Sequence, residues 1–93
     1  MSGMSGRSVF LDAVSGNETV GRYVQLFRMP LFLTMLDEEF KGYDDTVWEN
    51  SDRTEEIIRK VMPGTLSEFG IPGEMTDQVI AQCLDTFSTK KNG

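Results

Sequence analysis

Among the side chains that could bind a metal or take part in catalysis, carboxylates are the ones that cluster in one segment of this chain. Residues 37–56 hold nine of its fifteen acids and only two of its nine bases, and they sum to a charge of −7. Clustered carboxylates can bind a divalent cation or take part in acid–base catalysis. Each of these uses needs a particular spacing of side chains, which can be compared with the sequence.

A calcium-binding loop is the first arrangement to compare. An EF-hand loop that starts at Asp44 would place Glu55 at its twelfth position, as the motif requires. Its third and fifth positions, however, would be Thr46 and Trp48, and its sixth would be Glu49 instead of glycine. Because a tryptophan side chain offers calcium no oxygen ligand, we predict no metal-binding residue here.

Acid–base or nucleophilic catalysis has equally little support. Glu38 and Glu39 are adjacent in the chain, as are Asp44 and Asp45, so the side chains of each pair point in different directions. The chain has no histidine, the commonest general base and metal ligand. Its single cysteine, Cys83, lies on an apolar helical face, where a thiol is inert. We therefore expect no catalytic residue, no cofactor and no enzymatic activity.

Charge and cysteine content restrict the partners and the compartment. The net charge is −6, which disfavours direct binding to nucleic acid or to an anionic membrane. No segment approaches the roughly 20 apolar residues needed to cross a bilayer, so we expect no membrane partner. One cysteine cannot form an internal disulfide, which fits a reducing compartment, and we predict a cytoplasmic protein.

Apolar periodicity and capping residues predict two helices in the first part of the chain. One covers residues 8–14, with Ser8 as its N-cap and Gly16 beyond its end. The other covers residues 20–28 and is capped by Thr19. The predicted apolar face of this second helix comprises Val20, Tyr23, Val24, Leu26 and Phe27.

A third predicted helix, residues 30–40, starts at Pro30 and is unusually apolar. Its apolar residues span about 200° of the helical wheel, against the ~100° stripe of a surface helix. Such a helix must lie at the centre of the domain or be shared with a partner. We expect Gly42 to end it, and residues 43–50 to form an exposed acidic loop around Trp48.

The second half of the chain is predicted to hold two longer helices. Ser51 or Asp52 caps the first, which ends at Pro63 and Gly64. Residues 65–69 then form at most a single helical turn. The last helix covers residues 75–88.

These elements predict an all-α fold, a compact single domain of four to five short helices. An α+β alternative folds residues 22–36 into a small hairpin, although no Asn-Gly-type turn is present. We expect residues 1–7 to form a flexible N-terminal tail, 8–89 the helical domain, and 90–93 a polar C-terminal tail. The repeated Met-Ser-Gly of residues 1–6 is left out of this prediction.

An apolar helix that runs into an acidic segment is typical of a protein-binding surface. We therefore predict a non-catalytic protein–protein interaction module, such as a small acidic regulator, inhibitor or accessory subunit. Its partner is expected to be a protein with a basic surface, or a second copy of the chain in a homodimer. The residues predicted to contact the partner are Phe32, Met35, Asp37, Glu38, Phe40, Tyr43, Asp44, Asp45, Trp48 and Glu49. The alternatives are a small-ligand binder whose pocket includes Trp48 or Tyr43, and, less favoured, a carboxylate-dependent enzyme.

Overall fold

Helices make up the regular structure of this chain. The computed structural model describes residues 5–92, and that range contains five α-helices and two short 3-10 helices. In chain order they are α1 (Gly6–Ser15), α2 (Glu18–Tyr23), η1 (Leu26–Arg28), α3 (Met29–Phe40), η2 (Asp45–Glu49), α4 (Ser51–Glu68) and α5 (Gly73–Asn92). The all-α prediction is confirmed. The hairpin alternative is wrong, because residues 22–36 are divided among α2, η1 and α3 and contain no strand.

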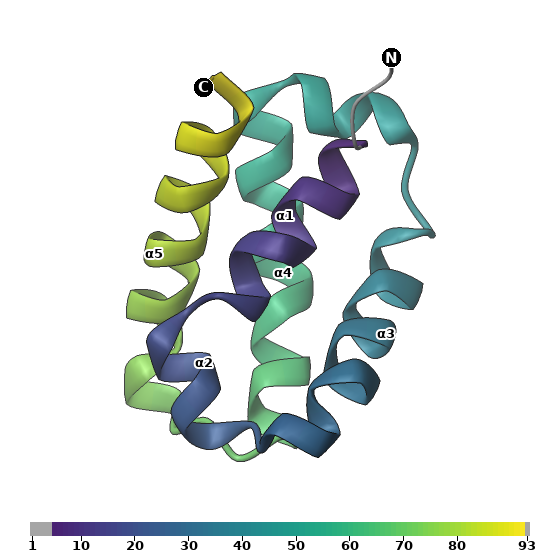
Figure 1. Cartoon of the computed structure of the whole chain (residues 1–93). Coiled ribbons are helices and arrows are strands. Elements are labelled where there is room, and N and C mark those ends of the chain that lie inside the picture. Colours follow the sequence, from purple (N-terminus) through teal and green to yellow (C-terminus); the bar gives the residue numbers. More distant parts are fainter. Residues whose placement is uncertain (1–4, 93) are drawn as a thin grey trace.

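Four of the helices pack side by side as a bundle (Figure 1). α1 contacts both α3 and α5, and α4 lies behind α1, also against α3 and α5. α2 and η1 close one end of the bundle, beside the turn that joins α4 to α5. η2 closes the opposite end, against α1 and α4. The molecule measures 34 × 25 × 24 Å, so its two ends are well separated.

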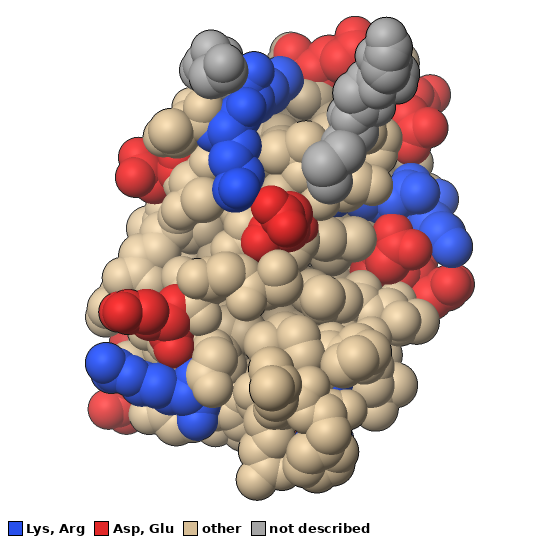
Figure 2. Space-filling model, viewed as in Figure 1, with Lys and Arg blue, Asp and Glu red and all other residues tan. Residues whose placement is uncertain are grey.

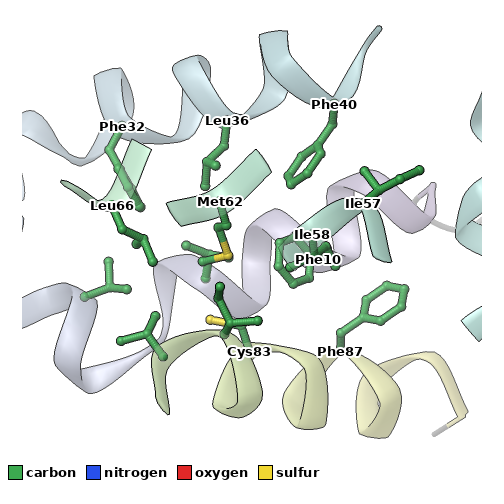
Figure 3. Close-up of a cluster of buried hydrophobic side chains, with 14 of the residues drawn as sticks. Phe10, Phe32, Leu36, Phe40, Ile57, Ile58, Met62, Leu66, Cys83 and Phe87 are labelled. Atoms are coloured by element: carbon green, nitrogen blue, oxygen red, sulfur yellow. The ribbon is translucent and has the colours of Figure 1, made fainter. Parts of the chain in front are cut away.

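One apolar core joins α1, α3, α4 and α5 (Figure 3). Phe10 of α1 packs edge-on against Phe40 and Phe87, with ring centroids 5.7 and 5.9 Å apart. α3 buries Phe32, Leu36 and Phe40, which are spaced four residues apart and therefore share one side of the helix. The core residues labelled in Figure 3 on α4 and α5 are Ile57, Ile58, Met62, Leu66, Cys83 and Phe87. Removing these side chains from water is the main source of stability.

Three helices begin earlier than predicted, because an upstream residue takes the capping position. The observed caps are Ser5, Asn17 and Asn50. The predicted caps were Ser8, Thr19 and either Ser51 or Asp52. Each observed cap has an extended backbone, and its side-chain oxygen accepts a hydrogen bond from the N–H three residues on, at 2.9 to 3.2 Å. The upstream caps lengthen the helices while still satisfying a free N–H at each start.

Two predicted helix ends are also wrong. The helix predicted over residues 20–28 stops after Tyr23, because Val24 adopts an extended conformation (φ −103°, ψ 110°) with its side chain in the core. α4 continues through Pro63 to Glu68, and residues 65–68 of the predicted turn at 65–69 are part of it. Met62 and Leu66, on either side of the proline, are fully buried, so packing holds the helix together there.

The end of α4 is a glycine-based cap. Gly70 has a φ of +86°, a left-handed conformation that suits glycine. Its N–H donates to the Ser67 carbonyl and the Ile71 N–H donates to the Leu66 carbonyl, both at 3.0 Å. Because Ile71 and Leu66 are buried, this turn is anchored in the core just before α5.

The helical domain also includes more residues at both of its ends than predicted. Gly6 and Arg7, expected in the N-terminal tail, belong to α1, and residues 90–92, expected in the C-terminal tail, belong to α5. Arg7 is held by Asp37, with 2.8 Å between Nε and Oδ1. Lys91 Nζ donates to the Trp48 carbonyl at 2.6 Å. The remaining tail residues, 1–4 and 93, lie outside the described residues.

Candidate functional site

The large apolar side chains that stay exposed lie together at one end of the bundle. Among the described residues, Leu26 is 88% exposed, Phe27 78%, Leu31 52% and Tyr23 39%. We call these four residues the apolar tip. They belong to the end of α2, to η1 and to the first turn of α3, which close the lower end of the molecule in Figure 1. On the face shown in Figure 2, that end is uncharged apart from a cluster at its left edge.

Buried residues on both sides of the apolar tip hold it in place. Val24 before η1 and Phe32 after it are 2% and 0% exposed, so both ends of this segment are fixed in the core. Gln25 between them is extended, and its carbonyl accepts hydrogen bonds from Arg28 N at 2.8 Å and Met29 N at 3.1 Å. These bonds form a tight turn whose large side chains face the solvent.

Contacts to α4 and α5 support the apolar tip from the sides. The Arg28 guanidinium carbon lies 4.7 Å from the centroid of the Phe69 ring, a cation–π contact. Phe69 in turn packs edge-on against Phe32, with 5.0 Å between the ring centroids. Tyr23 Oη lies 3.4 Å from Met75 Sδ. The apolar tip is therefore a supported surface at the end of the bundle.

The acidic residues gather toward the opposite end, where the chain's own bases pair with several of them. Asp37 pairs with Arg7 at 2.8 Å and with Lys41 at 3.4 Å. Arg7 also reaches Asp45 at 3.5 Å, and Lys41 reaches Glu38 at 3.5 Å. Those of these pairs whose side chains are mostly exposed contribute only about 0–1 kcal/mol each to stability. They do reduce the negative charge that this end presents to a partner.

Asp44 has a structural role at the same end. Its side chain accepts a hydrogen bond from the Thr46 N–H at 2.8 Å and caps η2. This backbone hydrogen bond, with a second one from the Thr46 side chain, lowers the pKa of Asp44. The position of this carboxylate is thus explained by capping, without a ligand.

The fold divides the ten residues that were predicted to contact a partner. Phe32, Phe40 and Trp48 are 0%, 1% and 4% exposed, so they are core residues and not the surface anchors that we expected. The half-buried members are Met35, Asp37 and Tyr43. The exposed members are Glu38, Asp44, Asp45 and Glu49. Most of the remaining candidates are therefore acids at the end opposite the apolar tip.

No family model, curated protein or solved structure gives a significant match to this chain. The candidate site is therefore assigned from the geometry of the chain itself. Within residues 5–92, no helix combines the length and the apolar character needed to cross a bilayer. In the same range, no three His, Cys, Asp or Glu side chains come together where they could hold a metal ion.

The exposed acidic loop predicted around Trp48 is replaced by a packed 3-10 helix. In η2 both Val47 and Trp48 are buried. The indole ring lies 5.3 Å from the Phe40 ring, 5.9 Å from Phe10 and 6.0 Å from Phe87, between centroids. Burial of so large an apolar ring outweighs the tendency of the surrounding acids to stay in water. The indole Nε1 has no hydrogen-bond partner among the described residues.

Two surface hollows bear on the small-ligand alternative. One of about 230 Å³ lies between the start of α4 and the end of α5, bordered by Thr54, Phe87 and Lys91. It is smaller than the roughly 300–1,000 Å³ of typical ligand pockets. Another of about 430 Å³ is bordered by Trp48 and Asp45 near the start of α1. Since Trp48 is only 4% exposed, its ring offers a ligand little surface.

The sequence pattern does not predict the apolar tip, because it places Leu26 and Phe27 on a continuous helical face. In an unbroken helix both would share a side with Val20 and Val24, which are indeed buried. The extended conformation of Val24 ends that helix and turns the following residues outward. Pro30 indicates a break before the next helix, but it does not locate that break at Val24.

Proposed function

We propose that this chain is a non-catalytic protein–protein interaction module that binds its partner through the apolar tip. The observation that carries the proposal is the exposure of Leu26 and Phe27, at 88% and 78%. Contiguous exposed apolar patches on soluble proteins mark interaction sites. A partner that covers these side chains gains about 25 cal/mol for each Å² of apolar surface removed from water.

The composition of the apolar tip fits a protein partner. Aromatic residues and arginine are enriched in protein interfaces, with a polar rim around an apolar centre. Tyr23 and Phe27 supply the aromatic rings, and the exposed Arg22 and Arg28 flank them in the chain. No acidic residue occurs between Glu18 and Asp37 in the sequence, so the centre of this surface carries no negative charge of its own.

The acidic end provides a second surface for the same function. Exposed acids such as Glu38, Asp45 and Glu49 would attract a basic partner and orient it. Pairing with Arg7 and Lys41 weakens this attraction, because Asp45 and Glu38 each already have a base of the same chain beside them. A role as regulator, inhibitor or accessory subunit, and a cytoplasmic location, belong to the same proposal and rest on small size, acidity and the single cysteine.

Affinity capture from a lysate of the native host tests which surface binds. The immobilised chain is compared with L26S/F27S, which removes most of the exposed apolar area of the tip. A matched variant, E38K/D45K/E49K, reverses exposed charges at the other end and leaves the Asp44 cap intact. We expect L26S/F27S to lose specific partners at least about tenfold, as hot-spot residues do, while the charge reversal weakens their capture less, because it removes only electrostatic steering.

Two results of the same experiment would contradict the proposal. If L26S/F27S retains every captured protein, the apolar tip is not the binding surface. If only the charge reversal loses partners, the acidic end is the interface and the apolar tip has no part in it. Both variants alter exposed side chains, so thermal unfolding should show that they are folded.

A further inference from the structure

The exposed apolar area of the tip is large enough for a small interface between two copies of this chain. Its four side chains expose on the order of 500 Å², since one aromatic side chain alone offers about 150–250 Å². Two facing tips would remove about 1,000 Å² from water in total, close to the lower limit for specific interfaces. Such a contact is sufficient for a weak, reversible dimer.

Charged residues of both signs adjoin, in the sequence, the apolar tip and the residues packed beside it. Arg22 and Arg28 flank it in the chain. Glu68 precedes Phe69, which contacts Arg28, and Glu74 precedes Met75, which contacts Tyr23. Both glutamates are exposed. In a two-fold arrangement each surface meets its own copy, so bases of one copy can face acids of the other, and the reverse. Such pairing would make the charges beside the tip complementary to those of a second copy.

Most of the negative charge that would oppose self-association lies far from the apolar tip. Residues 37–56 sum to −7, whereas residues 19–36 sum to +2, from Arg22 and Arg28 with no acid. α3 leads from the tip to the acidic end (Figure 1), and its 12 residues span about 18 Å. With the tips facing each other, the acidic ends of two copies point apart, beyond the ~8 Å screening length at physiological salt.

From area, rim charge and the position of the acids, we propose that the partner of the apolar tip is a second copy of this chain. The two copies meet tip to tip about a two-fold axis, with Leu26 and Phe27 of each at the centre. This inference rests on the proposed function, because it names the partner of the same surface.

Sedimentation equilibrium of the full chain tests the dimer from about 1 μM to about 1 mM, the range expected for so small an interface. We expect a concentration-dependent dimer. L26S/F27S should lower its association constant at least about tenfold, whereas L26M/F27L, which keeps the apolar area, should stay within about threefold. Melting temperatures establish that both variants are folded.

Cross-linking tests the orientation of the two copies. Cys83 is buried, so a cysteine introduced on the surface is the reactive thiol. Gln25 is exposed at the start of η1, and Asp52 is exposed near the opposite end. We expect a short bis-maleimide to link Q25C into dimers several-fold faster than D52C at equal concentration, because the tip-to-tip pair brings the two copies of Gln25 close together.

Three outcomes would overturn the tip-to-tip dimer: a chain that is monomeric up to about 1 mM, a dimer unchanged by L26S/F27S, or equal linking of Q25C and D52C. The capture experiment then separates this failure from that of the proposed function. If L26S/F27S still loses captured proteins, the interaction module stands with a different partner. If capture is also independent of the apolar tip, both proposals fail.

Discussion

The Asp44 carboxylate illustrates what single acidic residues do in this protein. The hydrogen bond from the Thr46 N–H lowers the pKa of Asp44. A carboxyl group with a lowered pKa stabilises the fold above its unfolded pKa, and this contribution disappears as the pH falls through the folded value. Asp37 likewise pairs with Arg7 across two helices. Much of the acidic segment therefore contributes to the fold, whether or not it also meets a partner.

Cys83 gives a pH-dependent prediction at the same scale. Burial raises the pKa of the thiol to about 12, whereas an unfolded chain titrates near 8.5. Between these values the unfolded state loses the proton and the folded state keeps it. The free energy of unfolding should therefore fall by about 1.4 kcal/mol per pH unit because of this residue.

Denaturant unfolding of the wild type and of Cys83→Ala from about pH 8 to about pH 11 measures this effect. All other ionisable groups are the same in both proteins, so their contributions cancel in the difference between the two stabilities. We expect the advantage of the wild type to shrink steadily above about pH 8.5. A difference that does not change with pH would show that the thiol is accessible in the folded protein.

At the scale of helices, the sequence predicted which segments are helical more accurately than it predicted the residue at which each helix begins. Apolar residues at helical spacing predicted the α-helices, since burial on one face follows directly from that spacing. Runs such as Asn50, Ser51 and Asp52 contain several residues that can cap a helix. Which of them caps depends on the backbone conformation that the rest of the fold imposes, and here Asn50 is the extended one.

This choice of cap predicts the effect of two neighbouring substitutions in α4. Asn50→Ala removes the acceptor of the Arg53 N–H and should lower the free energy of unfolding by about 1 kcal/mol. Ser51→Ala, one residue on, should change it by less than about 0.5 kcal/mol, because no capping bond is lost. Chemical denaturation of the two variants measures both values. Equal losses would mean that the two side chains share the cap.

The packing of α1 on η2 gives a second prediction for the helices. A Cβ atom at Gly6 would lie 2.5 Å from Trp48 Cβ, so Gly6→Ala must push the two elements apart. We expect a loss of about 1–3 kcal/mol in the free energy of unfolding. Gly64→Ala, inside α4, meets no atom within 4 Å and should instead stabilise the protein by about 0.5–1 kcal/mol. Thermal and denaturant unfolding distinguish a loss from a gain.

The candidate site was less predictable than the helices, for a physical reason. Four large apolar residues are involved, namely Leu26, Phe27, Phe32 and Trp48. From residue type alone, each of them would be predicted to be buried in the core or in an interface with a partner. One extended residue, Val24, turns the first two outward, while η2 turns Trp48 inward. Such local backbone changes depend on contacts between distant segments, which a helical wheel does not include.

At the scale of the whole molecule, apolar and acidic surfaces occupy opposite ends of one bundle. The arrangement follows from α3, which begins at the apolar tip and ends in Asp37, Glu38 and Glu39. A surface that loses water on binding and a surface that repels copies of itself are thereby kept apart. Association of two chains should then respond to salt in a characteristic way.

We expect the tip-to-tip dimer to strengthen as salt rises from about 0.05 M to about 0.5 M, because screening weakens repulsion between two chains of charge −6. E38K/D45K/E49K adds six positive charges to −6 and gives zero, so its dimer should be nearly insensitive to salt. Sedimentation at both salt concentrations measures the association constants. Weakening with salt would indicate instead that attraction between opposite charges of the two copies outweighs this repulsion.

The start of α1 and the end of α5 lie together at the acidic end, as the contacts of Gly6 and Lys91 with Trp48 also indicate. A chain tethered to a solid support through either helix would present the apolar tip outward. Neighbours on that support would all face the same way and could not pair, yet each could still capture one copy from solution. In a two-fold dimer of this kind both apolar tips are covered, so no further copy can add through this surface and no filament forms.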